Sequence, residues 1–232
     1  MTRCRGRVLR AVAFGLCCLG APALQAQESE AAPAEPADTA AAVNPEEFNA
    51  PAAIISQLHE TLLSVMQKAG ELDYASRYRV LEPIITTGFD TPLIVKVILS
   101  RYWTELTPQQ QSDFVALFRR LSVATYASRF NGYDRESFSE LSREALNRGR
   151  LLIRTELTRP DKKPVRLDYL MHKADDGQWR IISVIANGVN DLSLKRAEYA
   201  VVIKERGFDA LVADIERKIK EMESGASKPE AL

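Results

Sequence analysis

The sequence predicts an α+β fold in which an antiparallel meander of about four strands packs against helices from both ends of the chain. Apolar residues follow helical spacing up to Tyr133, change to a mostly alternating pattern from there to Ala186, and return to helical spacing afterwards. The alternating segments are joined by short turns, which favours antiparallel pairing. The chain has 232 residues and is 46% hydrophobic, enough for one domain, which we place at residues 49–223.

Residues 1–26 have the layout of a secretory signal peptide. Four arginines and no acid precede or interrupt an apolar run at residues 8–19, and small residues follow it. The run is shorter than the ~20 residues that span a bilayer, although an uncleaved anchor is the alternative. We expect cleavage after Ala26, with Ala23 as the second candidate, and therefore export.

Removal of this segment changes the chemistry that the chain offers. All three cysteines (Cys4, Cys17 and Cys18) leave with it, so the exported chain has no disulfide, thiol nucleophile or cysteine metal ligand. The 31 basic residues fall by four to 27 against 31 acidic ones, a net charge of −4. A mildly acidic chain lacks the basic footprint of a nucleic-acid-binding protein.

Two terminal segments lack the apolar residues that a core needs. Residues 27–48 are rich in Ala, Pro and Glu and predict a disordered linker. Residues 224–232 predict a disordered tail.

Two helices are expected first. Residues 51–68 carry apolar side chains at helical spacing, and Gly70 follows in a position suited to a helix end. A second helix is expected at residues 71–85, with residues 86–88 (Thr-Thr-Gly) breaking it.

Two further helices have sequence signals at their starts. The third begins after Asp90 or Thr91, either of which can cap it. The fourth begins at a capping box formed by Thr107 and Gln110, and it runs to about Phe130. Its apolar stripe consists of Phe114, Leu117, Phe118, Leu121 and Thr125, with Val115 and Tyr126 beside them.

Basic residues of the fourth helix, Arg119, Arg120 and Arg129, are expected largely off its apolar stripe. For the basic residues around Arg119 and Arg120, the simplest interpretation is a solvated helix face. The alternative is a contact with lipid headgroups or with an acidic partner.

Four strands are expected next. Residues 149–158 and 165–173 alternate well, whereas residues 137–145 are a weaker candidate for which a helix remains possible. Residues 178–186 are apolar on both faces, which predicts a central strand. The pair Asn187-Gly188 then breaks the sheet.

Two helices are expected after the sheet. Asp191 or Ser193 can cap the first, which runs to about Arg206 and ends at Gly207. The second is expected at residues 208–222.

The sequence offers little for catalysis. Neither His59 nor His172 lies in a metal-ligand spacing, and both are interpreted as ordinary, partly exposed residues. No nucleophile elbow or phosphate-binding loop appears. We therefore expect no catalytic residues, no metal and no cofactor. The remaining apolar side chains suit either a solid core, as in an exported scaffold or interaction protein, or an apolar cavity.

Three stretches resemble the MlaC, or toluene-tolerance, family: GFDTPLIVKVIL, RYWTELTPQQQSDFVALFRRLSVATYASRFNGY and VRLDYLMHKADDGQWRIISVIANGVNDLSLKRAEYAVVI. The resemblance covers residues 51–219, and ATYASRFNGY is most similar to the HpnM-like, hopanoid-associated branch. It implies a monomeric periplasmic carrier that holds a phospholipid or a hopanoid in an apolar cavity between sheet and helices. Its implied partners are an inner-membrane ABC transporter complex and an outer-membrane lipid-exchange complex.

The resemblance and the apolar stripes together define the side chains that we expect to bind lipid. They are Phe89, Leu93, Val97, Trp103, Phe114, Phe118, Tyr126, Tyr133, Tyr169, Met171, Trp179, Ile182, Val184 and Val189. Ser100 departs from the family, because phospholipid-binding members usually have Gly there. The choice between phospholipid and hopanoid therefore stays open.

Overall fold

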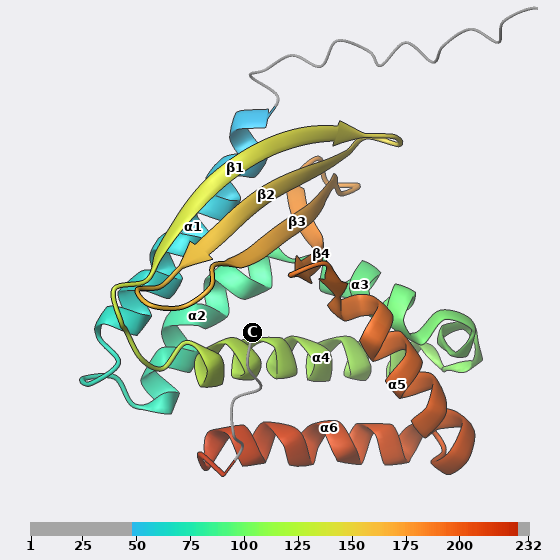
Figure 1. Cartoon of the computed structure of the whole chain (residues 1–232). Helices are drawn as coiled ribbons and strands as arrows, with labels where there is room; N and C mark the ends of the chain where they lie inside the picture. The colour runs from blue at the N-terminus through green and yellow to red at the C-terminus, as the bar shows by residue number, and fades with distance from the viewer. Residues whose placement is uncertain (1–47, 227–232) are drawn as a thin grey trace, which may run out of the picture. The chain divides into compact units, whose positions relative to one another are not determined.

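The computed structural model describes residues 48–226, which form six α-helices, a 3₁₀ helix and a five-stranded antiparallel sheet. The strands lie in the sheet in their order along the chain, which is a meander. Helices α1 to α4 precede the sheet and α5 and α6 follow it (Figure 1). The predicted α+β class and the meander are therefore confirmed. The predicted signal peptide, and most of the predicted linker and tail, lie outside the described residues.

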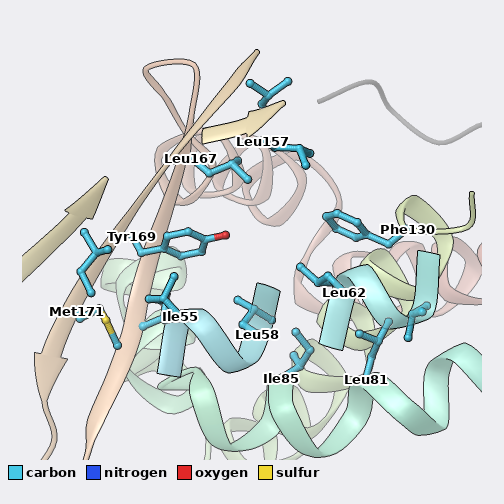
Figure 2. Packing of buried hydrophobic residues seen from close by; sticks show 14 of the residues in the cluster. Ile55, Leu58, Leu62, Leu81, Ile85, Phe130, Leu157, Leu167, Tyr169 and Met171 are labelled. Carbon is cyan, nitrogen blue, oxygen red and sulfur yellow. The ribbon is translucent and has the colours of Figure 1, made fainter. Parts of the chain in front are cut away.

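Helix α1 (Asn49–Gln67) packs against the sheet. Its buried stripe includes Ile55 and Leu58, which lie near Tyr169 of β3, and Leu62, which lies toward Phe130 (Figure 2). Phe48, the last position of the predicted linker, directly precedes the helix and packs partly buried against the same cluster.

Helix α2 (Tyr74–Gly88) is shifted from the predicted 71–85 at both ends. It starts later because the Asp73 carboxylate accepts the backbone N–H three residues on, at 2.8 Å. It ends later because the hydroxyls of Thr86 and Thr87 donate to carbonyl groups one turn earlier, so these residues continue the helix.

The next two helices have the caps that the sequence indicates. Helix α3 (Thr91–Leu99) is capped by Asp90, and the 3₁₀ helix η2 (Ser100–Glu105) follows it. Helix α4 (Pro108–Arg129) starts at Thr107, whose hydroxyl accepts the N–H of the third helical residue at 3.2 Å. The side chain of that residue accepts the Thr107 N–H at 2.9 Å, which completes the predicted capping box.

The sheet consists of β1 (Ser137–Leu146), β2 (Arg150–Thr158), β3 (Val165–Lys173), β4 (Trp179–Ala186) and β5 (Val189–Asn190). The segment for which a helix remained possible is therefore a strand, β1. Strands β2 and β3 bury alternate residues, as their sequence pattern predicts.

The strand predicted at residues 178–186 is β4, which lies between β3 and β5 and is therefore an interior strand of the sheet, as expected. Beyond β4 the sheet continues only as the two-residue strand β5. The rest of this edge is covered by the segment that links α2 to α3. Phe89 forms a parallel bridge with Ile181, and the Asp90 N–H donates to the Ile181 carbonyl at 3.0 Å. Helices α1, α2, α3 and α5 all contact β4, which explains why this strand is apolar on both faces.

The turn after β4 also differs from expectation. Asn187 and Gly188 both have positive φ (49° and 82°), which a two-residue hairpin turn requires, so the chain reverses and pairs again as β5. Asn190, and not Asp191 or Ser193, then caps α5. Its side-chain oxygen accepts the backbone N–H groups of Leu192 and Ser193, at 3.0 and 3.4 Å.

Helices α5 (Asp191–Arg206) and α6 (Phe208–Glu223) have nearly the predicted bounds. Gly207 joins them with φ 88°, a conformation that favours glycine. Helix α6 packs against α4 and α5, and α5 packs against α3 (Figure 1).

Buried apolar residues form two clusters. One lies between α1, α2 and the sheet, and the other lies between α3, α4, α5 and α6. Each fully buried Leu, Ile or Phe stabilises the fold by about 1.5–3 kcal/mol relative to an exposed one. Within residues 48–226, no helix is both long and apolar enough to cross a membrane.

Candidate lipid-binding site

A cavity of about 530 Å³ lies where the sheet, α4 and the start of α5 meet. Most of its lining is apolar. It is lined by Phe89, Ile94, Phe118, Leu121, Ser122, Thr125, Tyr126, Arg129, Phe130, Leu167, Tyr169, Ile182, Ser183, Val184, Ala186, Asn187, Val189, Asp191, Leu192, Leu194 and Lys195. Its volume lies within the ~300–1,000 Å³ typical of small-molecule sites.

One face of α4 forms the helical wall. Its lining residues recur at spacings of three and four, from Phe118 through Leu121, Thr125 and Tyr126 to Arg129. This spacing places them in one row along three turns. The N-terminal half of α4 does not line the cavity at Phe114. This side chain is buried edge-on against Tyr199 of α5, with ring centroids 6.4 Å apart.

The opposite wall is the inner face of β3 and β4. Leu167 and Tyr169 alternate along β3, and Val184 and Ala186 alternate along β4. The register pairs Tyr169 with Val184 and Leu167 with Ala186. These four side chains therefore form one continuous apolar patch.

Three aromatic rings join the two walls. Tyr126 stacks on Phe130 with ring centroids 5.7 Å apart, and it meets Phe89 edge to face at 6.0 Å. Phe89 is held by its bridge to β4. Burial raises the pKa of Tyr126 above its ordinary value, so its hydroxyl stays protonated.

Tyr169 connects the cavity to the core around α1. Its hydroxyl lies 3.0 Å from Nε2 of His59, whose ring stacks on Phe138 at 4.0 Å. Burial raises the pKa of Tyr169 and lowers the pKa of His59 to about 4, so both are neutral at pH 7. The expectation that His59 is partly exposed is wrong, since its exposed fraction is 8%. His172 is partly exposed, and its Nε2 lies 2.7 Å from Oδ2 of Asp90.

Three charged side chains belong to the lining. They are Arg129 at the end of α4, and Asp191 and Lys195 in the first turns of α5. Lys195 Nζ donates to Asp191 Oδ1 at 3.0 Å. Because Arg129 lines the cavity, it lies on the same face of α4 as the apolar lining residues. The helical pattern of the sequence placed it largely off the apolar stripe of this helix.

A second hollow of about 270 Å³ lies between α4, α5 and α6. It shares Leu121, Thr125, Arg129 and Lys195 with the larger cavity. Its other lining residues include charged side chains of both signs from α5 and α6.

The structure brings part of the predicted lipid-binding set into the cavity. The residues that line it are Phe89, Phe118, Tyr126, Tyr169, Ile182, Val184 and Val189. The residues that lie outside it are Leu93, Val97, Trp103, Phe114, Tyr133, Met171 and Trp179.

Packing explains the second group. Phe114 and Met171 are fully buried in the two cores, and Trp103 packs partly buried against the helical one. Val97 and Tyr133 are exposed to 41% and 45%. Trp179 packs partly buried against the sheet cluster, and Leu93 is partly exposed on α3.

Several cavity residues were not in the predicted lipid-binding set. Ser122 and Arg129 lie on the same face of α4 as Phe118. Helical spacing alone identifies them if polar residues, and not only apolar ones, are counted as candidate lining residues. Leu192, Leu194 and the other α5 residues reach the cavity only because the hairpin turn after β4 places the start of α5 beside it. The local signal for this turn is the Asn187-Gly188 pair, which favours a two-residue hairpin but was interpreted as the end of the sheet. No cluster of His, Cys, Asp or Glu suited to a metal ion occurs in residues 48–226.

Comparisons with known proteins agree with this geometry. A sequence model of the MlaC protein family matches residues 56–217. Among solved structures, one similar protein is a phospholipid-binding protein from Ralstonia solanacearum, determined in complex with a phospholipid. The two chains are 19% identical with a TM-score of 0.64, and the match covers 73% of this chain and 97% of that chain. At this identity, the similarity shows a common fold.

Proposed function

This chain belongs to the MlaC protein family, and on that premise we propose that it is a periplasmic carrier that holds the acyl chains of a lipid in the cavity between the sheet and α4. The observation that carries the proposal is the continuous apolar lining formed by β3, β4 and α4. A scaffold protein with a solid core would not contain such a cavity.

Hydrophobic burial gives the proposed cavity its energetic role. Each buried methylene gains about 0.8 kcal/mol, so one chain of about 15 methylenes gains on the order of 12 kcal/mol. A lipid does not cross water unaided against such a barrier, and a matching apolar cavity lowers it. The described lining has the aromatic and aliphatic side chains that this task needs.

The carrier needs partners at both membranes. We propose that it exchanges lipid with an inner-membrane ABC transporter complex and with an outer-membrane complex, as its family does. Binding alone gives no direction, because a ligand shifts an equilibrium only through differential affinity. Direction therefore comes from the partners. The predicted signal peptide, which lies outside the described residues, supports the periplasmic location.

We propose phospholipid as the ligand and retain hopanoid as the alternative. The Ralstonia solanacearum protein of the same fold was determined with a phospholipid, which supports the first. The ATYASRFNGY segment, with its similarity to the hopanoid-associated branch, supports the second.

Val184→Arg tests the cavity directly. Val184 is partly buried in the lining, so the variant places a guanidinium group among apolar side chains. We expect lipid loading to fall at least about tenfold, since 1.4 kcal/mol suffices for that change. Native mass spectrometry of the purified protein measures the loaded fraction. Tyr169 is less suitable for this substitution, because its loss also removes the partner of His59.

Val80→Arg is the matched control. Val80 lies on α2, outside the cavity, and is exposed to 43%, so this variant should keep wild-type loading. Equal loading of the Val184 and Val80 variants would mean that acyl chains do not occupy this cavity.

A further inference from the structure

The dipeptide Asn-Gly occurs twice in the chain, at Asn131-Gly132 and at Asn187-Gly188. In such a pair the backbone nitrogen of the glycine can attack the side-chain carbonyl carbon of the asparagine. Glycine favours this attack because it has no Cβ to hinder the approach and restricts the backbone least. The asparagine must first rotate its side chain toward that nitrogen, so the folded structure decides which of the two pairs reacts.

The hairpin after β4 holds Asn187 in place. Its backbone N–H donates to the Arg166 carbonyl at 2.9 Å, and its side-chain Oδ1 accepts the Arg166 N–H at 2.9 Å. Its φ of 49° belongs to the tight turn that joins β4 to β5. Attack by the Gly188 nitrogen would break the side-chain hydrogen bond and open this turn, so the second pair is protected.

The surroundings of Asn131 differ in each of these respects. Asn131 and Gly132 lie outside any helix or strand, in the segment between α4 and β1, and both are exposed. Neither has the positive φ of the hairpin turn. Among residues 48–226, no hydrogen bond holds the Asn131 side chain. It is therefore free to rotate toward the Gly132 nitrogen.

Aspartate before glycine can react in the same way, and Asp176-Gly177 is such a pair. Its Oδ1 accepts the Gln178 N–H at 3.0 Å and the Arg180 guanidinium N–H at 2.8 Å. The hydrogen bond from Arg180 lowers the pKa of Asp176 to about 2, so its carboxyl group is ionised at neutral pH. An ionised carboxylate resists attack by a nucleophile, and this turn is protected as well.

We propose that Asn131-Gly132 is a site of spontaneous deamidation in the folded protein. The Gly132 nitrogen forms a bond to Cγ of Asn131, and the side-chain nitrogen leaves as ammonia, which carries away the proton of the Gly132 amide. Water then adds to either carbonyl group of the succinimide ring and breaks its C–N bond. The products are aspartate and isoaspartate, and the reaction needs no oxidant, reductant or bound lipid.

The modification falls at one end of the helical wall of the cavity. Asn131 directly follows Phe130, whose ring lines the cavity and stacks on Tyr126 with centroids 5.7 Å apart. Aspartate at this position adds a negative charge at neutral pH, and isoaspartate lengthens the backbone by a methylene group. Both products therefore change the chain directly beside a cavity residue.

The test compares the two Asn-Gly pairs within one protein. Full-length wild-type protein is incubated in mildly alkaline buffer, with and without guanidinium chloride, and its peptides are quantified by mass spectrometry. In buffer, deamidation at Asn131 should be at least about tenfold faster than at Asn187, which corresponds to a barrier difference of about 1.4 kcal/mol. In guanidinium chloride, where the hairpin is lost, the two rates should agree within about threefold.

Gly132→Ala is the matched variant. A Cβ at this position meets no atom within 4 Å, and Gly132 lacks the positive φ that would strain an alanine, so the fold should be unchanged. The methyl group hinders attack by the backbone nitrogen. Deamidation at Asn131 should therefore fall at least about tenfold, both in buffer and in guanidinium chloride.

Two results in buffer would overturn the proposal. They are equal rates at Asn131 and Asn187, and an Asn131 that stays unmodified although it reacts in guanidinium chloride. An unchanged rate in the Gly132→Ala variant would overturn the attack by the Gly132 nitrogen.

Discussion

The buried contact between His59 and Tyr169 predicts how stability depends on pH. His59 Nε2 lies 3.0 Å from the Tyr169 hydroxyl, and burial lowers the pKa of His59 from 6.5 to about 4. The unfolded chain therefore binds a proton between these two pH values when the folded chain does not. Stability is fully present above pH 6.5 and is lost as the pH falls toward 4.

The size of the loss follows from the two pKa values. A difference of 6.5 − 4 = 2.5 corresponds to about 3 kcal/mol at 1.36 kcal/mol for each pKa unit. That is a large part of the ~5–15 kcal/mol that stabilises a typical domain.

His59→Gln is the appropriate substitution, because a glutamine amide can replace the Nε2 contact with Tyr169 without titrating. Urea unfolding is measured at pH 7.5, 5.5 and 4. The wild type should lose about 3 kcal/mol more than the His59→Gln variant over this range.

Parallel pH profiles for the wild type and the His59→Gln variant would refute this reasoning. They would mean that His59 takes up its proton in the folded state as readily as in the unfolded chain. The ring would then be accessible to water, in contrast to its exposed fraction of 8%.

Two further predictions concern local structure. Ser100 has φ 52°, a strained conformation for a side chain, so Ser100→Gly should stabilise the fold by about 1 kcal/mol despite losing the contact from Arg196 at 2.9 Å. Thermal unfolding measures this, and a Ser100→Gly variant no more stable than Ser100→Ala would contradict it. Asn190→Ala should cost about 1–2 kcal/mol in urea unfolding, because its side chain caps α5 and also accepts the hydroxyl of Ser183 at 3.2 Å. An unchanged midpoint would show that water replaces this cap.

Local signals predict the elements of this fold well. The capping box at Thr107, the cap at Asp90 and the alternation of β2 and β3 all occur as predicted, because each depends on neighbours within a few residues. The wrong predictions at Thr86 and Asn190 also concern contacts between residues that are close along the chain. In both cases a side chain bonds to the backbone in one of two competing ways, and sequence does not decide between them.

Long-range contacts explain what the sequence does not predict. Periodicity identifies Phe114 and Phe118 as residues of one apolar stripe, but it cannot show that Tyr199 fills the space beside Phe114 while a cavity remains beside Phe118. The burial of His59 depends on Phe138 and Tyr169, which lie about 80 and 110 residues away along the chain. Such sites require the packing of the whole domain.

The central claim is that the cavity beside Val184 holds the acyl chains of a lipid. The most direct measurement is native mass spectrometry of the full-length protein isolated from the periplasm, followed by release and identification of any bound molecule. We expect one lipid for each protein chain, with a phosphodiester headgroup. Protein that is repeatedly free of lipid, and that cannot be loaded with phospholipid or hopanoid in vitro, would contradict the claim.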